Sequence, residues 1–242
     1  MKTVVLGDIH GRVIWKDILN VEKDADRIIF LGDYVSTHYG ILQELQLLNL
    51  NEILDFKEAN YKKVFLLRGN HDVQHLGYHW GRCSGLFEIV AACMPKDRFL
   101  SLTQWDVIDD DAKIIFSHAG ISKVWQERAE IGDVHDINDM PPTELFGFSL
   151  ADYPKDNYGT SPTQPLTWIR PETLLEHAVA GWTQVVGHTP ADEMYSRTTV
   201  NNDVVWFCDT LEEGQYLVIE NGVFTPKKIE VKKPQRWMRF RF

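Results

Sequence analysis

The 242-residue chain lacks several features that mark particular classes of protein. No apolar run approaches the roughly 18 to 20 residues that a membrane-spanning helix needs, so we expect no membrane association. Three widely spaced cysteines, Cys83, Cys93 and Cys208, form no CxxC pair, which argues against a disulfide framework. The start, MKTVVLGDIHGR, has too short an apolar stretch for a signal peptide. Together these absences predict a cytoplasmic protein.

An excess of positive charge is also missing, because 25 Lys and Arg oppose 35 Asp and Glu and the formal net charge is -10. Proteins that bind nucleic acid by neutralising phosphates are usually basic, so we do not expect a nucleic-acid partner. The exception is a basic tail at 227–242, where bases alternate with aromatic residues. This tail predicts either an edge strand packed on the acidic body or a surface for a phosphate-rich partner. The acidic remainder is consistent with a bound cation.

One pattern is present five times: a short apolar run ends in a small residue, and a side chain able to bind metal follows at once. The five segments are TVVLG before Asp8, RIIFLG before Asp33, KVFLLRG before Asn70, KIIFS before His118 and TQVVG before His188. Short runs rich in Val, Ile and Phe are typical of buried strands. His10 lies two residues after Asp8 and therefore points to the same side of the strand end. We expect these six side chains to line one edge of a sheet.

Helical patterns fall between these strands, at 41–58, 86–93 and 171–180. Alternation of strands and helices predicts an α/β fold. The length fits one large domain or two small ones, and we expect a single domain over 1–242. The strand-rich segment 198–231, with a turn at Asn221-Gly222, predicts mixed rather than purely parallel sheets.

The segment 123–165 has little periodicity and predicts an irregular cap or insertion. Such a segment is either a functional lid or a surface excursion.

The ordered motifs GDIHG, GDY, GNHD, SHAG and GHTP resemble those of the calcineurin-like metallophosphoesterase superfamily. Within it, the chain is similar to the bacterial phosphoprotein-phosphatase type, which includes serine/threonine protein phosphatases and symmetrical diadenosine-tetraphosphate hydrolases. The motifs run from residue 7 to 190, and CDT at 208–210 is similar to a late Asp-Thr motif of those enzymes. The resemblance implies a four-layer α/β/β/α sandwich of two mixed β-sheets flanked by helices.

The resemblance also implies two divalent cations, with manganese favoured over iron, zinc or nickel. The residues implied for the first cation are Asp8, His10 and Asp33, and those for the second are Asp33, Asn70, His118 and His188. A hydroxide shared by the two ions would attack phosphorus in line. His71 is implied as the acid that protonates the leaving group, or alternatively as a residue that orients a neighbour. Arg170, in PLTWIRP, is implied as a phosphate-binding residue, the alternative being an ordinary surface arginine.

The second motif departs from the GDxxDRG of the family, because this chain reads GDYVSTHYG. Ser36 stands at the position of the acid that partners the catalytic histidine, and Thr37 at that of a second phosphate-binding arginine. Losing one oriented arginine contact would cost on the order of 2–3 kcal/mol of transition-state stabilisation. His38 is adjacent, and His75 and His79 are candidates for a substitute. For the last two, a surface helix face is the alternative.

These observations predict a dinuclear metal-dependent phosphoesterase that hydrolyses a phosphomonoester of a protein or a small molecule. A dinucleoside-polyphosphate hydrolase or other phosphodiesterase is one alternative, and a non-catalytic metal-binding scaffold is another.

Overall fold

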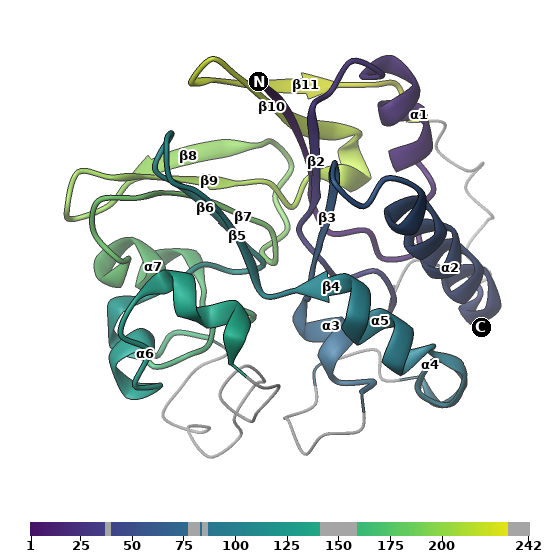
Figure 1. The fold of residues 1–242 in the computed structure, drawn as a ribbon, viewed down its shortest axis with the longest axis horizontal. Coiled ribbons are helices and arrows are strands. Elements are labelled where there is room, and N and C mark those ends of the chain that lie inside the picture. The colour runs from purple at the N-terminus through teal and green to yellow at the C-terminus, as the bar shows by residue number, and fades with distance from the viewer. Residues whose placement is uncertain (37–39, 77–82, 84–86, 141–158, 232–242) are drawn as a thin grey trace, which may run out of the picture.

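Two β-sheets lie face to face in the computed structural model, which describes residues 1–36, 40–76, 83, 87–140 and 159–231 (Figure 1). The first sheet has six strands in the order β11-β10-β1-β2-β3-β4, and the second has five in the order β5-β6-β7-β9-β8. In each sheet, parallel pairs at the centre adjoin antiparallel pairs nearer an edge. The expected mixed sheets are therefore confirmed.

The strands of the first sheet are β1 (Lys2–Leu6), β2 (Arg27–Phe30), β3 (Val64–Leu67), β4 (Thr103–Gln104), β10 (Gln215–Glu220) and β11 (Val223–Lys228). Those of the second are β5 (Asp106–Asp109), β6 (Ile114–Ser117), β7 (Thr183–Val186), β8 (Tyr195–Thr198) and β9 (Val204–Phe207). All five runs that the sequence marked as strands are strands.

Alternate residues of the central strands face two different cores, which explains why these runs are apolar throughout. In β1, Val4 and Leu6 belong to the core under the helices, whereas Val5 belongs to the core between the sheets. In β2, Phe30 and Ile29 divide in the same way. A side chain on either face of these strands is therefore removed from water.

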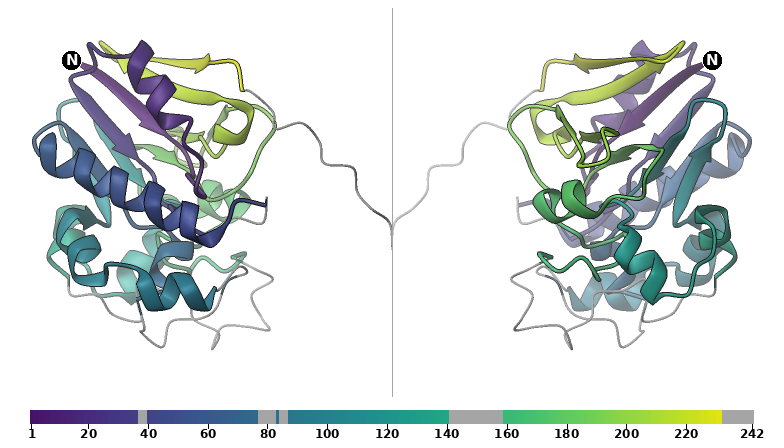
Figure 2. Two further views of the ribbon diagram at one scale, coloured as in Figure 1. Left: turned by 90° about the vertical axis from the view of Figure 1, so that its right-hand side faces the viewer. Right: turned by 90° about the vertical axis from the view of Figure 1, so that its left-hand side faces the viewer.

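Helices cover the outer face of each sheet (Figures 1 and 2). On the first sheet lie α1 (Trp15–Val21), α2 (Gln43–Ala59) and α5 (Lys96–Leu102), and on the second lies α7 (Pro171–His177), which packs Leu174 against Val186 and Phe207. The shorter helices are α3 (Asn70–Val73), α4 (Glu88–Cys93) and α6 (Lys123–Arg128), with 3-10 turns η1 (Val134–Asp139) and η3 (Leu211–Glu213). The four-layer α/β/β/α sandwich is therefore confirmed.

The predicted helices at 41–58, 86–93 and 171–180 correspond to α2, α4 and a shorter α7. The turn at Asn221-Gly222 joins β10 to β11, and both residues have positive φ, 51° and 77°, as a tight hairpin requires. No helix in the described ranges combines the length and the apolarity needed to cross a membrane.

The segment 123–165 differs from the irregular cap that its composition predicts. Residues 123–140 form α6 and η1, and their Trp125, Val134 and Ile137 are buried in the main core. Residues 141–158 lie outside the described part of the chain, so a lid at this place stays a prediction. In the basic tail, Lys227 belongs to β11 and pairs with Glu22 at 2.8 Å, whereas 232–242 lie outside the described residues.

Candidate active site

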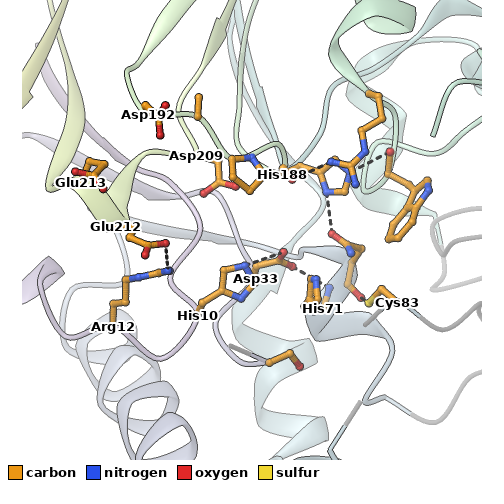
Figure 3. Close-up of a pocket in the computed structure, with 16 residues that line it drawn as sticks. His10, Arg12, Asp33, His71, Cys83, His188, Asp192, Asp209, Glu212 and Glu213 are labelled. Atoms are coloured by element: carbon orange, nitrogen blue, oxygen red, sulfur yellow. Dashed lines mark hydrogen bonds and ion pairs between the residues drawn. The ribbon is translucent and has the colours of Figure 1, made fainter. Parts of the chain in front are cut away.

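The six predicted metal-binding side chains follow the carboxyl ends of five strands from both sheets. Parallel pairing of β1 with β2, of β2 with β3 and of β6 with β7 turns the ends within each sheet in one direction. A cavity of about 540 Å³ opens there, and His10, Asp33, Asn70 and His188 line it (Figure 3). Asp8 and His118 lie beneath and are almost fully buried. The structure thus brings all six together.

Two groups of ligand-type atoms share one carboxylate. Oxygen or nitrogen atoms of Asp8, Asp33 and His118 lie within 4.8 Å of one another, and so do those of His10, Asp33 and His71. Asp33 belongs to both groups, as a residue shared by two cations would, but the groups join Asp8 to His118 and His10 to His71, which differs from the predicted division of the ligands. The grouping also places His71 close enough to the centre to bind metal or to meet a substrate held there.

Three atoms with lone pairs converge at Asn70. Nδ1 of His118 donates to the carbonyl of Leu31 at 2.8 Å, so its Nε2 carries the lone pair, and this nitrogen lies 2.9 Å from Oδ1 of Asn70. His188 mirrors this arrangement, since Nε2 donates to the carbonyl of Trp168 and Nδ1 lies 3.0 Å from the same Oδ1. Burial lowers the pKa of both imidazoles, that of His118 to about 3, so both are neutral. A divalent cation fits among these three atoms.

His10 presents its ring in a comparable way. Nδ1 donates to the carbonyl of Val35 at 3.0 Å, and Nε2 lies 3.7 Å from Oδ2 of Asp33. His10, Asp33 and His188 all have positive φ, at 44°, 52° and 66°. Left-handed backbone costs a non-glycine residue on the order of 1–3 kcal/mol, and such strain gathers at binding and catalytic sites.

Buried carboxyl groups surround this centre. Burial raises the pKa of Asp8 and of Asp33, that of Asp72 to about 7 and that of Asp209 to about 6. Asp8 and Asp209 also hydrogen-bond to each other, and repulsion between neighbouring carboxylates acts in the same direction as burial. A bound cation would reverse these shifts, because it favours the ionised form. The donor set therefore fits hard or borderline divalent cations.

Two glycines allow the close approach of these groups. A Cβ added at Gly187 would collide with Oδ1 of Asp8, and one at Gly69 would collide with the carboxylate of Asp33. At these two positions glycine is thus required by the packing of the opposite strand end rather than by its own φ, whereas Gly32, before Asp33, has a φ of 113°.

The two remaining predicted residues also reach the cavity. The backbone N–H of His71 donates to Asp33 at 2.8 Å, and its ring meets that of His10 edge to face at 5.1 Å. Arg170 lines the cavity and donates to Oγ1 of Thr189 at 3.1 Å. A guanidinium in this position is able to bind an anion that enters the cavity.

Near Ser36, where the second motif differs from that of the family, the structure corrects the expectation for His75. His75 is not on a surface helix face: it is 1% exposed, and its Nε2 lies 2.7 Å from Oγ of Ser36. Thr37, His38 and His79 lie outside the described residues.

Sequence reasoning missed several residues of the site. Asp72 accepts hydrogen bonds from the backbone N–H of Asp33, Tyr34 and Gly69 and so ties two of the loops together. Asp209 belongs to the CDT motif noted in the sequence but received no role there; it lines the cavity and follows VVWFC, the same pattern of apolar strand and small residue that marked the other ligands. The rim residues Arg12, Cys83, Asp192, Glu212 and Glu213 carried no such signal (Figure 3).

Comparison with known proteins supports the family that the sequence motifs resemble. Among solved structures, the chain is similar to a cold-active protein-tyrosine phosphatase of a psychrophilic Shewanella species, at 19% identity and a TM-score of 0.61 over 95% of this chain and 80% of that one. It is also similar to a serine/threonine protein phosphatase from Saccharomyces cerevisiae, at 16% identity and a TM-score of 0.57 over 97% and 82%. These likenesses show the fold. The family model of the calcineurin-like phosphoesterases matches residues 1–219, so the chain belongs to the calcineurin-like phosphoesterase family.

Proposed function

We propose that this protein is a phosphomonoesterase that requires two divalent cations. The convergence of three unprotonated side-chain atoms at Asn70, beside a carboxylate that two ligand groups share, is the observation that carries the proposal. Asp8, His10 and Asp33 would hold one cation, and Asp33, Asn70, His118 and His188 the other. When bound, such cations supply a water of lowered pKa and neutralise charge on phosphoryl oxygens.

The side chains that are not ligands have separate tasks. Arg170 binds the phosphoryl oxygens, because its guanidinium faces the cavity and is held there by Thr189. His71 meets the oxygen of the leaving group and holds a proton for it, because its ring stands beside the centre on the side away from Arg12 and Glu212 (Figure 3).

Charge on the rim supports a phosphomonoester over a polyphosphate. Asp192, Glu212 and Glu213 line one side of the cavity, and Arg12 is engaged by Glu212 at 2.9 Å. A dinucleoside polyphosphate would bring several further negative charges to these carboxylates, which is unfavourable at short range. A phosphorylated protein side chain or a small phosphate monoester brings no such charge.

Hydrolysis of p-nitrophenyl phosphate by the purified chain, with and without Mn²⁺, tests the proposal. We expect activity with Mn²⁺ and its loss on chelation. Asp33→Asn should lose bound metal and activity together, whereas the exposed Asp17→Asn should lose neither. His71→Ala should retain the metal and lose turnover.

The alternatives give different results in the same assay. A phosphodiesterase would hydrolyse bis-p-nitrophenyl phosphate at least as well as the monoester. A metal-binding scaffold would bind Mn²⁺ and hydrolyse neither compound. Either result would overturn the proposal.

A further inference from the structure

Arg12 stands on a tight turn after β1, and its backbone is fixed at both its N–H and its carbonyl. The N–H donates to the carbonyl of Ile9 at 2.9 Å, and the carbonyl accepts from Nδ2 of Asn49 at 3.2 Å. The preceding residue, Gly11, donates its own N–H to the carbonyl of Tyr34 at 2.8 Å. The side chain of Arg12 therefore starts from a well-held point beside the candidate centre.

This side chain reaches the cavity that holds the candidate ligands. Arg12 lines the cavity, its side chain is 15% exposed, and Nη2 donates to Oε2 of Glu212 at 2.9 Å. Glu212 belongs to η3, on the rim of the cavity, and its own side chain is half exposed. A guanidinium carries five N–H donors in one plane, so its bond to Glu212 is compatible with binding a second anion.

Arg12 and Arg170 act on the centre from different sides. Nη1 of Arg170 lies 3.4 Å from the carbonyl oxygen of His188, and Figure 3 shows Arg12 and His188 on opposite sides of Asp33. Burial raises the pKa of Asp209 to about 6, and both guanidinium groups oppose this shift. Both positive charges therefore lie near the same cavity-lining carboxyl group.

A phosphoryl group can accept hydrogen bonds from more than one direction. During transfer its charge is spread over three oxygens, and one planar guanidinium donates to at most two of them. We propose that Arg12 is a second phosphate-binding residue: its guanidinium, held by Glu212, donates to an oxygen of the phosphoryl group from the side of the cavity opposite Arg170. This role rests on the proposed function, because it adds to the binding of the group that is hydrolysed.

A purely structural pair and a phosphate-binding arginine predict different results when the pair is broken. If the pair only joined the turn after β1 to η3, loss of either partner would have the same effect. If Arg12 binds phosphate, the two losses act in opposite directions. Arg12→Met removes a donor to the anion, whereas Glu212→Gln removes a negative charge beside it.

Calorimetric titration of the Mn²⁺-loaded protein with inorganic phosphate measures this difference without the need for turnover. Arg12→Met should raise the Kd for phosphate by about 10- to 100-fold, as expected for a lost charge-assisted hydrogen bond. Glu212→Gln should leave the Kd equal or lower it. The matched control is Arg98→Met on α5, which breaks ion pairs with Asp55 and Glu58 outside the cavity and should not change the Kd. Equal losses of affinity in Arg12→Met and Glu212→Gln would overturn the proposal.

Arg12→Lys separates direct contact from attraction at a distance, and it keeps the test decisive if Arg12→Met folds poorly. Lysine retains the positive charge but lacks the planar set of donors that holds Glu212 and phosphate together. We therefore expect the Kd for phosphate to rise severalfold in this variant as well. A Kd equal to that of the unmodified chain would overturn direct binding by Arg12.

Hydrolysis of p-nitrophenyl phosphate by the same variants distinguishes this role from the proposed function. We expect kcat/KM to fall in Arg12→Met together with the affinity for phosphate. An active protein in which neither quantity depends on Arg12 would overturn the role of Arg12 alone. A protein that binds phosphate through Arg12 but hydrolyses no ester would overturn the proposed function and leave this role supported.

Discussion

Oδ1 of Asn70 and Nε2 of His118 face each other at 2.9 Å without a proton between them, since the only proton of the neutral ring is on Nδ1 and bonds to Leu31. Two lone pairs at this distance repel each other in the metal-free protein and attract a cation placed between them. We therefore expect the side chain of Asn70 to lower the stability of the metal-free protein and to raise that of the metal-bound protein.

Asn70→Ala tests this relationship. A ligand at 100 times its Kd stabilises a protein by about 2.7 kcal/mol, which for this length corresponds to a rise in Tm of about 5–10 °C. We expect this rise with Mn²⁺ in the unmodified chain and little of it in Asn70→Ala. With a chelator present, the variant should melt no lower than the unmodified chain. The exposed Asn20→Ala should keep the full Mn²⁺ effect, and a full effect in Asn70→Ala would refute the assignment.

Gly187→Ala should damage the centre by steric conflict alone. The added methyl group would collide with Oδ1 of Asp8, which must then move from its place beside the other ligands. We expect the content of bound Mn²⁺, measured by elemental analysis, to fall together with phosphatase activity. In the control, Gly132→Ala, the nearest atom to the new Cβ is 3.9 Å away, so metal and activity should persist. Unchanged metal content in Gly187→Ala would show that Asp8 is not a ligand.

Arg170→Met should reduce catalysis without removing metal. Charge-assisted hydrogen bonds contribute about 1.5–3 kcal/mol, so we expect kcat/KM for p-nitrophenyl phosphate to fall by roughly 10- to 100-fold. Elemental analysis should find the same metal content as in the unmodified chain. Arg197→Met, on the exposed edge strand β8, is the matched control. An unchanged kcat/KM in Arg170→Met would remove this residue from substrate binding.

Asp106→Asn should change how stability depends on pH. Burial raises the pKa of Asp106 to about 7, although Asn138 donates to it. The native state therefore keeps a proton that the unfolded state loses near pH 4, and stability falls as the pH rises from about 4 to about 7. Asparagine does not titrate, so the variant does not lose stability over this pH range. Compared with the unmodified chain, it should be more stable at pH 8 by about 2–4 kcal/mol and nearly equally stable at pH 4.

Urea unfolding at the two pH values measures this difference. The exposed Asp111→Asn serves as the control and should show the same offset at both. The measured quantity is the free energy of unfolding of Asp106→Asn minus that of the unmodified chain. If this difference were the same at pH 8 as at pH 4, the raised pKa of Asp106 would be contradicted.

The sequence by itself determined the strands and the residues at their ends. Val4, Val5 and Leu6 are all apolar because each face of β1 is buried, and such a run is recognisable without knowing what covers it. The polar residue that follows, such as Asp8, marks the place where the apolar run and the strand stop. For the same local reason the turn at Asn221-Gly222 was predicted, since only particular residues adopt two consecutive positive φ values.

Only the tertiary structure decided which of these ends meet and what stands behind them. The carboxylate of Asp8 accepts from the backbone N–H of His188, 180 residues away, because two separate sheets pack with their strand ends together. His75 reads as a surface residue in sequence and is buried against Ser36 because a loop from another strand covers it. Contacts of this kind depend on the order and packing of the strands, which no local pattern of residues encodes.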